Sequence, residues 1–149
     1  MKKIGDYTVR GQVNTSDGDV ERIILFDRRF DTGYKITHFE IAFQNRNDTA
    51  IEIASAKLTT TDEGIDNRDW NWGINTEIAW ASCAHDANVL STQSPVSVVD
   101  RDNLIVEDLF IGAYSYTDTE VINYLIHMEK YDISDFRGAL AMVRNRSQA

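Results

Sequence analysis

The chain is poor in cysteine and proline and contains no long apolar run, and the shortage of cysteine and of apolar runs limits the class of protein. Its 149 residues include a single cysteine, so no disulfide can form within the chain and an oxidising compartment is not required. No apolar run approaches the roughly 18 residues that a membrane-spanning helix needs. Lysines follow Met1 as in a signal peptide, but no apolar segment comes next, so we expect no signal peptide.

Positive charge is also in short supply. The chain has 15 Lys and Arg against 24 Asp and Glu, which gives a net charge of −9. Binding to phosphate groups requires clustered Lys and Arg, so this balance argues against direct nucleic-acid binding and against docking on an anionic membrane. We therefore expect a soluble protein whose partners are neither nucleic acid nor membrane.

What the sequence does contain is a succession of alternating apolar and polar residues, the pattern of half-buried β-strands. Clusters of Asn, Asp and Gly separate these segments, and the single proline, Pro95, precedes one of them. We expect a bulge near Ala54 and a hairpin between the last two strands. The predicted strands are 7–13, 20–26, 34–43, 50–60, 77–84, 96–99, 104–117 and 121–131.

Many short strands without intervening helices indicate one all-β domain over residues 1–149, an antiparallel β-sandwich of about eight strands. Eight strands with two long loops favour a jelly roll. An immunoglobulin-like sandwich is the alternative, but the Cys…Trp…Cys spacing of that fold is absent. Only the tail predicts a helix, a short C-terminal one with Ser134 as N-cap and with Phe136, Leu140 and Val143 on one face.

All three tryptophans lie close together, with Trp70 and Trp72 in a loop and Trp80 in the next strand. Such a cluster plugs a core, anchors a partner subunit or stacks on a sugar. In the sugar interpretation, Trp70 and Trp72 form a flat platform while Asp69 and Asn71 bond hydroxyl groups. All three interpretations stay open, with core and interface ahead of sugar.

Two further clusters have both a binding and a structural interpretation. The cationic residues of the tail, Arg137, Arg144 and Arg146, either pair with an acidic patch on a neighbouring subunit or complement the dipole of the predicted helix. The acidic loop around Asp62, Asp66 and Asp69 has the oxygen ligands that calcium prefers, but its spacing is not that of an EF-hand. Solvated acidic turns are the simpler explanation, and calcium is the only cofactor that the sequence suggests.

No catalytic signature is present, and we predict that the protein is not an enzyme. Cys83 and His85 are two apart on a strand, too far for a good hydrogen bond without a bend, so a buried Cys beside a loop His is the preferred interpretation. The other histidines, His38 and His127, lack the close companions of a zinc site.

Three segments resemble the small structural proteins of tailless or marine viruses, many of which are single jelly rolls. They are Ile23 to Tyr34, the stretch from Trp70 to Trp80, and the segment ending Tyr131-Asp132-Ile133-Ser134. The resemblance implies a shell-building role with no catalytic residues to carry over. One departure is the lack of the basic arm that genome-facing capsid proteins often have, which leaves a shell that lies away from nucleic acid or a surface protein.

The leading hypothesis is therefore a structural protein that self-assembles, a capsid or virion component whose partners are copies of itself or other virion proteins. The alternative is a carbohydrate-binding module or lectin that binds glycans through the Trp70–Trp72 loop, secreted or cytoplasmic. A hydrolase or isomerase in a β-barrel ranks last. Exposure of Trp70 and Trp72 discriminates between the first two.

Overall fold

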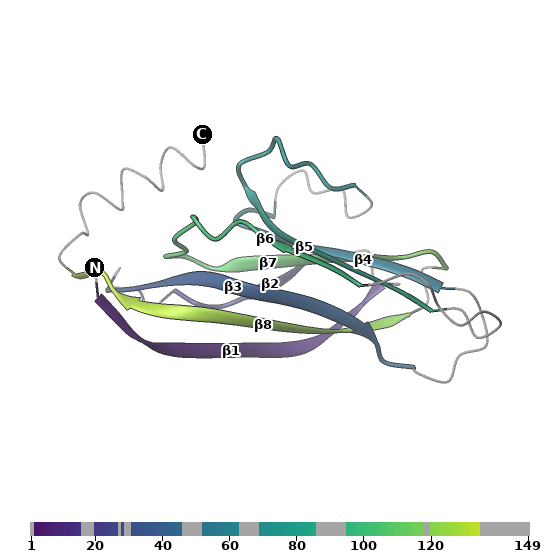
Figure 1. The fold of residues 1–149 in the computed structure, drawn as a ribbon, viewed down its shortest axis with the longest axis horizontal. Helices are drawn as coiled ribbons and strands as arrows, with labels where there is room; N and C mark the ends of the chain where they lie inside the picture. The colour runs from purple at the N-terminus through teal and green to yellow at the C-terminus, as the bar shows by residue number, and fades with distance from the viewer. Residues whose placement is uncertain are drawn as a thin grey trace.

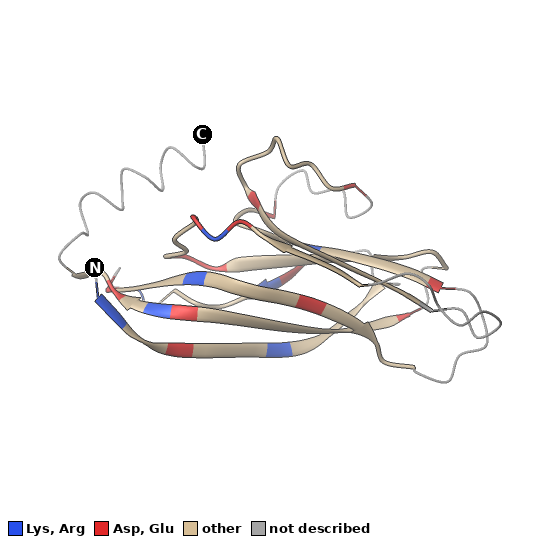
Figure 2. Ribbon diagram, viewed as in Figure 1, with Lys and Arg blue, Asp and Glu red and all other residues tan. Residues whose placement is uncertain are grey.

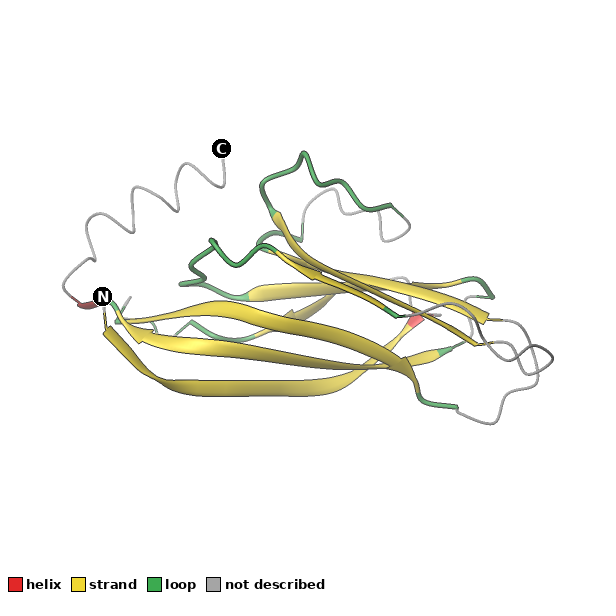
Figure 3. Ribbon diagram, viewed as in Figure 1, coloured by secondary structure: helices red, strands yellow, loops and turns green. Residues whose placement is uncertain are grey.

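The computed structural model describes residues 2–15, 20–26, 28, 31–45, 52–62, 69–85, 95–117 and 120–134, and within them the chain forms eight strands and no α-helix (Figures 1 and 3). None of the described residues forms a helix that could cross a membrane. The strands are β1 (Lys2–Asn14), β2 (Glu21–Ile23), β3 (Thr32–Phe43), β4 (Glu52–Thr59), β5 (Glu77–His85), β6 (Val96–Val99), β7 (Leu109–Ser115) and β8 (Val121–Asp132).

The strands form two antiparallel sheets that pack face to face. The three-stranded sheet has the order β1-β8-β3, and the five-stranded sheet has the order β2-β7-β4-β5-β6. The pairing is nested, because β1 pairs with β8, β2 with β7, and β4 with β5. A jelly roll has this nested pairing, because it is one long antiparallel hairpin of eight strands that is wound into a sandwich. The all-β sandwich predicted from the sequence is confirmed.

One strand departs from perfect nesting. β6 pairs with β5 instead of joining the three-stranded sheet beside β3. It still lies next to β3, since the hydroxyl of Ser97 donates a hydrogen bond to the carbonyl oxygen of Phe39. β6 therefore closes one side of the sandwich between the two sheets.

Alternation along the strands builds the core. In β1, Val9 and Val13 face the five-stranded sheet while Thr8, Arg10 and Gln12 face outward, as predicted. The largest fully buried apolar side chains come from both sheets and from the segments that join them: Phe39, Leu58, Ile78, Leu109, Ile111, Ile122, Ile126, Met128, Ile133 and Val13. One continuous apolar layer thus holds the two sheets together.

The structure corrects three expectations about the strands. No irregularity occurs at Ala54, because Ile53 simply faces outward while Ala54 faces the core; the register shift of β4 comes later, between Leu58 and Thr59. β7 begins only at Leu109, because Ile105 crosses to the other sheet and exchanges two backbone hydrogen bonds with Tyr34.

The third correction concerns the last two strands. β8 is not the hairpin partner of β7, since it lies between β1 and β3 in the other sheet. The predicted C-terminal helix, with Arg137, Arg144 and Arg146, lies outside the described residues, which end at Ser134.

A close contact between β1 and β8 requires a glycine. Gly11 is the register partner of Tyr124, and a Cβ at Gly11 would lie 2.6 Å from the phenolic oxygen and 2.9 Å from the ring carbon that bears it. The ring of Tyr124 therefore fills the space above the glycine. Gly5, on the same strand, has no atom within 4 Å of such a Cβ.

We expect Gly11→Ala to lower the free energy of unfolding by about 1–3 kcal/mol, because the added methyl group must push the Tyr124 ring out of its packed position. Gly5→Ala is the matched control, and its stability should be unchanged or slightly higher, since alanine restricts the unfolded chain. Urea denaturation followed by circular dichroism measures both. Equal effects of the two substitutions would contradict this account.

Candidate functional site

The tryptophan loop, residues 69–76, lies on the outer face of the five-stranded sheet. Ala56 and Ala81 are register partners that face the core, so the adjacent partners Lys57 and Trp80 face outward. Both are nevertheless buried, with 1% of Lys57 and 5% of Trp80 exposed. The loop is the segment that covers them, and Figure 1 shows it rising above the sheet between β4 and β5.

The carboxylate of Glu77, at the start of β5, holds this loop in place. One oxygen accepts hydrogen bonds from the backbone N–H of Asn71 at 2.8 Å and from the indole N–H of Trp80 at 3.1 Å. The other accepts from the Lys57 ammonium at 3.0 Å and from the Asn71 side-chain amide at 3.3 Å. Lys57 also donates to the backbone carbonyl of Asp69 at 2.9 Å. The buried ion pair thus binds the first part of the loop, from Asp69 to Asn71, to the sheet.

The hydrogen bonds decide the charge state of Glu77. Burial by itself raises the pKa of a carboxyl group, because it disfavours the charged form. Here the donors from Asn71, Trp80 and Lys57 outweigh burial and hold the pKa of Glu77 below its ordinary value. The group therefore stays ionised at neutral pH, as its partnership with a buried lysine requires.

The three tryptophans have different surroundings. Trp80 is buried beneath the loop on the outer face of the sheet and is not part of the core between the sheets, whereas Trp72 is 66% exposed and its ring centroid lies 5.8 Å from that of Trp80 at a tilt of 57°. Trp70 is partly buried, and its ring nitrogen has no hydrogen-bond partner among the described residues. Trp72 is thus the one indole of the three that is largely exposed to solvent.

Apolar residues of β6 extend the surface around Trp72. Trp80 is the common neighbour, since it contacts Trp72 through its ring and pairs with Val98 in the sheet. We call the large apolar residues that are exposed in this region the Trp72 surface: Trp72, Ile74, Val96 and Val98. Between 69 and 76 the chain has one charged residue, Asp69, and most of the loop is uncharged in Figure 2.

The calcium hypothesis is only partly addressed by the structure. Asp62 and Asp69 are exposed, and Asp66 lies outside the described residues. Among the side chains that the structure describes, no three His, Cys, Asp or Glu residues gather as metal ligands would. Calcium binding by Asp62, Asp66 and Asp69 stays a prediction.

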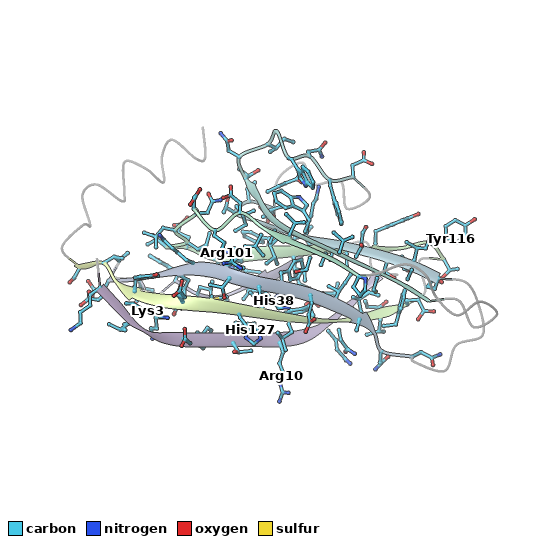
Figure 4. All side chains as sticks on the ribbon, in the orientation of Figure 1. Lys3, Arg10, His38, Arg101, Tyr116 and His127 are labelled. Carbon is cyan, nitrogen blue, oxygen red and sulfur yellow. The ribbon has the colours of Figure 1, made fainter. Side chains whose placement is uncertain are left out.

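A pair of histidines that the sequence did not suggest lies on the outer face of the three-stranded sheet. His38 of β3 and His127 of β8 are register partners, and their ring centroids are 5.7 Å apart (Figure 4). Thr8 of β1 lies 3.0 Å from His127 Nδ1. Only the strand order brings these residues together, because they are far apart in the sequence.

Cys83 is half-buried on the inner face of β5, opposite Ala54, and packs against the core. His85 is the last residue of β5 and not part of a loop as expected.

A second buried carboxylate anchors the chain after β2. Asp108 accepts hydrogen bonds from the backbone N–H groups of Leu25 at 2.9 Å and Phe26 at 3.1 Å, and forms an ion pair with Arg22. Burial raises the pKa of Asp108, but these donors outweigh it and the pKa lies below its ordinary value. A cavity of about 260 Å³ beside this group is also lined by Asp62.

No known protein family and no curated protein matches this chain in sequence. Among solved structures, VP1 of Trichodysplasia spinulosa-associated polyomavirus is similar, with 5% identity and a TM-score of 0.48. The likeness covers 87% of this chain and 97% of the VP1 chain. At that level of similarity, the function must be argued from the residues of this chain.

We expect Glu77→Gln to lower the free energy of unfolding by about 3–5 kcal/mol, because it leaves the buried Lys57 ammonium without a counter-charge. Glu40→Gln is the matched control, since Glu40 is exposed and its 3.5 Å contact with His38 lies in water. Urea denaturation gives the stability, and tryptophan fluorescence reports whether the loop has moved. A Glu77→Gln protein as stable as the control would show that the ion pair does not hold the loop.

Stability should decrease in acid, in part through Asp108. A carboxyl group whose pKa is lowered by folding stabilises the protein at any pH above its pKa in the unfolded chain, which is near 3.8 for Asp. This contribution to stability is lost as the pH falls through the pKa of the folded state. Asp108→Asn should therefore be less stable than wild type at pH 7, with a smaller loss of stability between pH 5 and pH 2. Urea titrations across this range test it. Asp102→Asn, in an exposed turn, should follow wild type.

Proposed function

We propose that this chain is a structural protein that self-assembles and builds part of a virion shell. The observation that carries the proposal is the exposed Trp72 side chain, which stands on a loop fixed from beneath by the buried Lys57–Glu77 pair.

Large aromatic side chains on rigid supports are typical anchors of protein interfaces. Tryptophan is enriched among the residues that dominate binding energy, and each ordered support lowers the entropy lost on binding. The neighbouring Ile74, Val96 and Val98 are exposed as well, so a partner that covers Trp72 also removes their apolar area from water. Association of copies through the Trp72 surface follows from this arrangement.

The assignment to a virion rests on three supports. The nested strand pairing is that of a jelly roll, an architecture used by viral capsid proteins and by lectins. The sequence resembles small virion structural proteins in the segments given above. The net charge of −9 suits a shell component that does not face the genome.

Glycan binding through the Trp70–Trp72 loop is the alternative function. Trp72 alone could stack on a sugar ring, since its indole is largely exposed. The exposed platform of two indoles does not form, because Trp70 is partly buried. The geometry therefore favours a protein interface over a sugar site.

The mass of the protein in solution, measured by light scattering over a concentration series, tests the proposal. We expect wild type to form oligomers, and Trp72→Ala to raise the concentration needed for association at least about tenfold, a change of roughly 1.4 kcal/mol. Tyr116→Ala is the matched control, because Tyr116 is an equally exposed aromatic residue at one end of the sandwich (Figure 4). A wild-type protein that stays monomeric at all concentrations overturns self-assembly. Binding of a glycan array by wild type and not by Trp72→Ala would then support the alternative.

A further inference from the structure

Among the described strands, β1 is a long edge strand with no strand paired on one of its sides. In the described part of the chain, β8 is the only strand that pairs with it, and the pairing covers its full length from Lys2 to Asn14 (Figure 1). β2 and β6, the edges of the other sheet, are far shorter, with 3 and 4 residues against 13 in β1. Long edges present unpaired backbone groups to which another strand can bind.

The backbone groups that face outward can be assigned. The N–H of Thr15 donates to the carbonyl of Glu120 at 3.0 Å, on the side of β8. Successive residues of a strand point their N–H groups to opposite sides. The N–H and C=O groups of Asp6, Thr8, Arg10 and Gln12 therefore point away from β8, toward the open side.

We propose that a second copy of this chain binds here, with the two β1 strands antiparallel and Thr8 opposite Thr8 of the second copy. Thr8 is the middle residue of β1, so this register pairs the strand over its whole length. It also places Asp6 opposite Arg10 of the second copy, and Arg10 opposite its Asp6. The pairing has twofold symmetry and joins two three-stranded sheets into one of six strands.

Charge selects this register over its neighbours. Asp6 and Arg10 lie two residues on either side of Thr8 on the outer face, and Figure 2 shows them as one red and one blue segment of β1. Centring the pair on Asp6 would oppose two aspartates, and centring it on Arg10 would oppose two arginines. Centring it on residue 7 or 9 would leave these charges opposite uncharged residues. If one β1 strand slid along the other by a single residue, outward-facing residues would lie opposite core-facing ones, and the apolar face of one copy would turn outward.

The side chains of the edge are available for this pairing. Asp6 is 80% exposed, and its 3.1 Å contact with Lys3 is a surface ion pair of little energy. The Arg10 side chain extends away from the sandwich in Figure 4.

On the inner face, the same register sets Tyr7 opposite Val9 of the second copy. Tyr7 is 44% exposed in the single chain. Aromatic and β-branched residues form favourable cross-strand pairs, so this contact removes apolar surface that the edge leaves in water.

This inference rests on the proposed self-assembly and names one surface that serves it. Cross-linking tests the register directly in a Cys83→Ser background, which removes the native thiol. We expect Thr8→Cys chains to form a disulfide-linked dimer under mild oxidation, because opposed Cα atoms of antiparallel strands lie about 4.5–5.5 Å apart, within disulfide range.

The matched control is Gln12→Cys in the same background. The two substituted positions would be eight residues apart along the paired strands, about 27 Å, so no cross-link should form. Cross-linking of the two variants to the same extent, or of neither while wild type is oligomeric, would overturn the β1 pairing and leave self-assembly through other surfaces intact. A wild-type protein that is monomeric throughout would remove both.

Charge exchange gives an independent result. Asp6→Lys and Arg10→Glu each place like charges opposite one another in the pair, so each variant alone should dimerise at least about tenfold more weakly than wild type. Mixing the two variants restores opposite charges in both contacts, and the mixed dimer should regain wild-type affinity within about threefold. Analytical ultracentrifugation with one variant labelled measures this. A mixture that associates no better than its components would contradict the register.

Discussion

The buried carboxylate of Glu77 determines what the outer face of the five-stranded sheet presents to solvent. Lys57 belongs to a strand whose other face is packed in the core, so without cover its ammonium would project into water. The loop at 69–76 covers it, and the ion pair with Glu77, together with the bonds to Asn71 and the Asp69 carbonyl, keeps that cover in place. Trp80 is buried beneath the loop and Trp72 is left on top. The position of the exposed indole therefore depends on a polar network below it.

The Trp72 surface and the β1 edge lie on different sheets and differ in their chemistry. The first is apolar, whereas the second has backbone groups that point away from β8 and charges of opposite sign two residues on either side of Thr8. Under the proposed self-assembly, a subunit with two such surfaces would contact one neighbour through each of them, which would build an extended assembly and not an isolated dimer. The net charge of −9 disfavours non-specific association between copies of the chain.

Much of the fold could be predicted from the sequence. The predictions that failed did so because they concerned which segments pair with one another. Alternation identified all eight strands, and it placed Val9, Gly11 and Val13 on the correct face of β1. It failed for 104–117, because Ile105 keeps the apolar pattern while bonding to Tyr34 of the other sheet. It also gave β8 the wrong neighbour, since nearness in sequence suggested a hairpin. The site was predicted only in part, because the cluster of tryptophans was visible but the role of Lys57 and Glu77 was not.

By itself the sequence determined the local properties: where the chain is extended, which residues of a strand share a face, and the net negative charge. These follow from the two-residue period of a strand and from composition, which need no knowledge of distant contacts. Only the tertiary structure decided which strands pair, which strand is left as an open edge, and which tryptophan is exposed. These depend on hydrogen bonds between segments far apart in the chain, such as that from the Thr15 N–H to the Glu120 carbonyl, and on a loop that folds over a charged residue. The alternation of apolar and polar residues along a strand is the same whichever strand it pairs with, so it cannot predict the pairing partner.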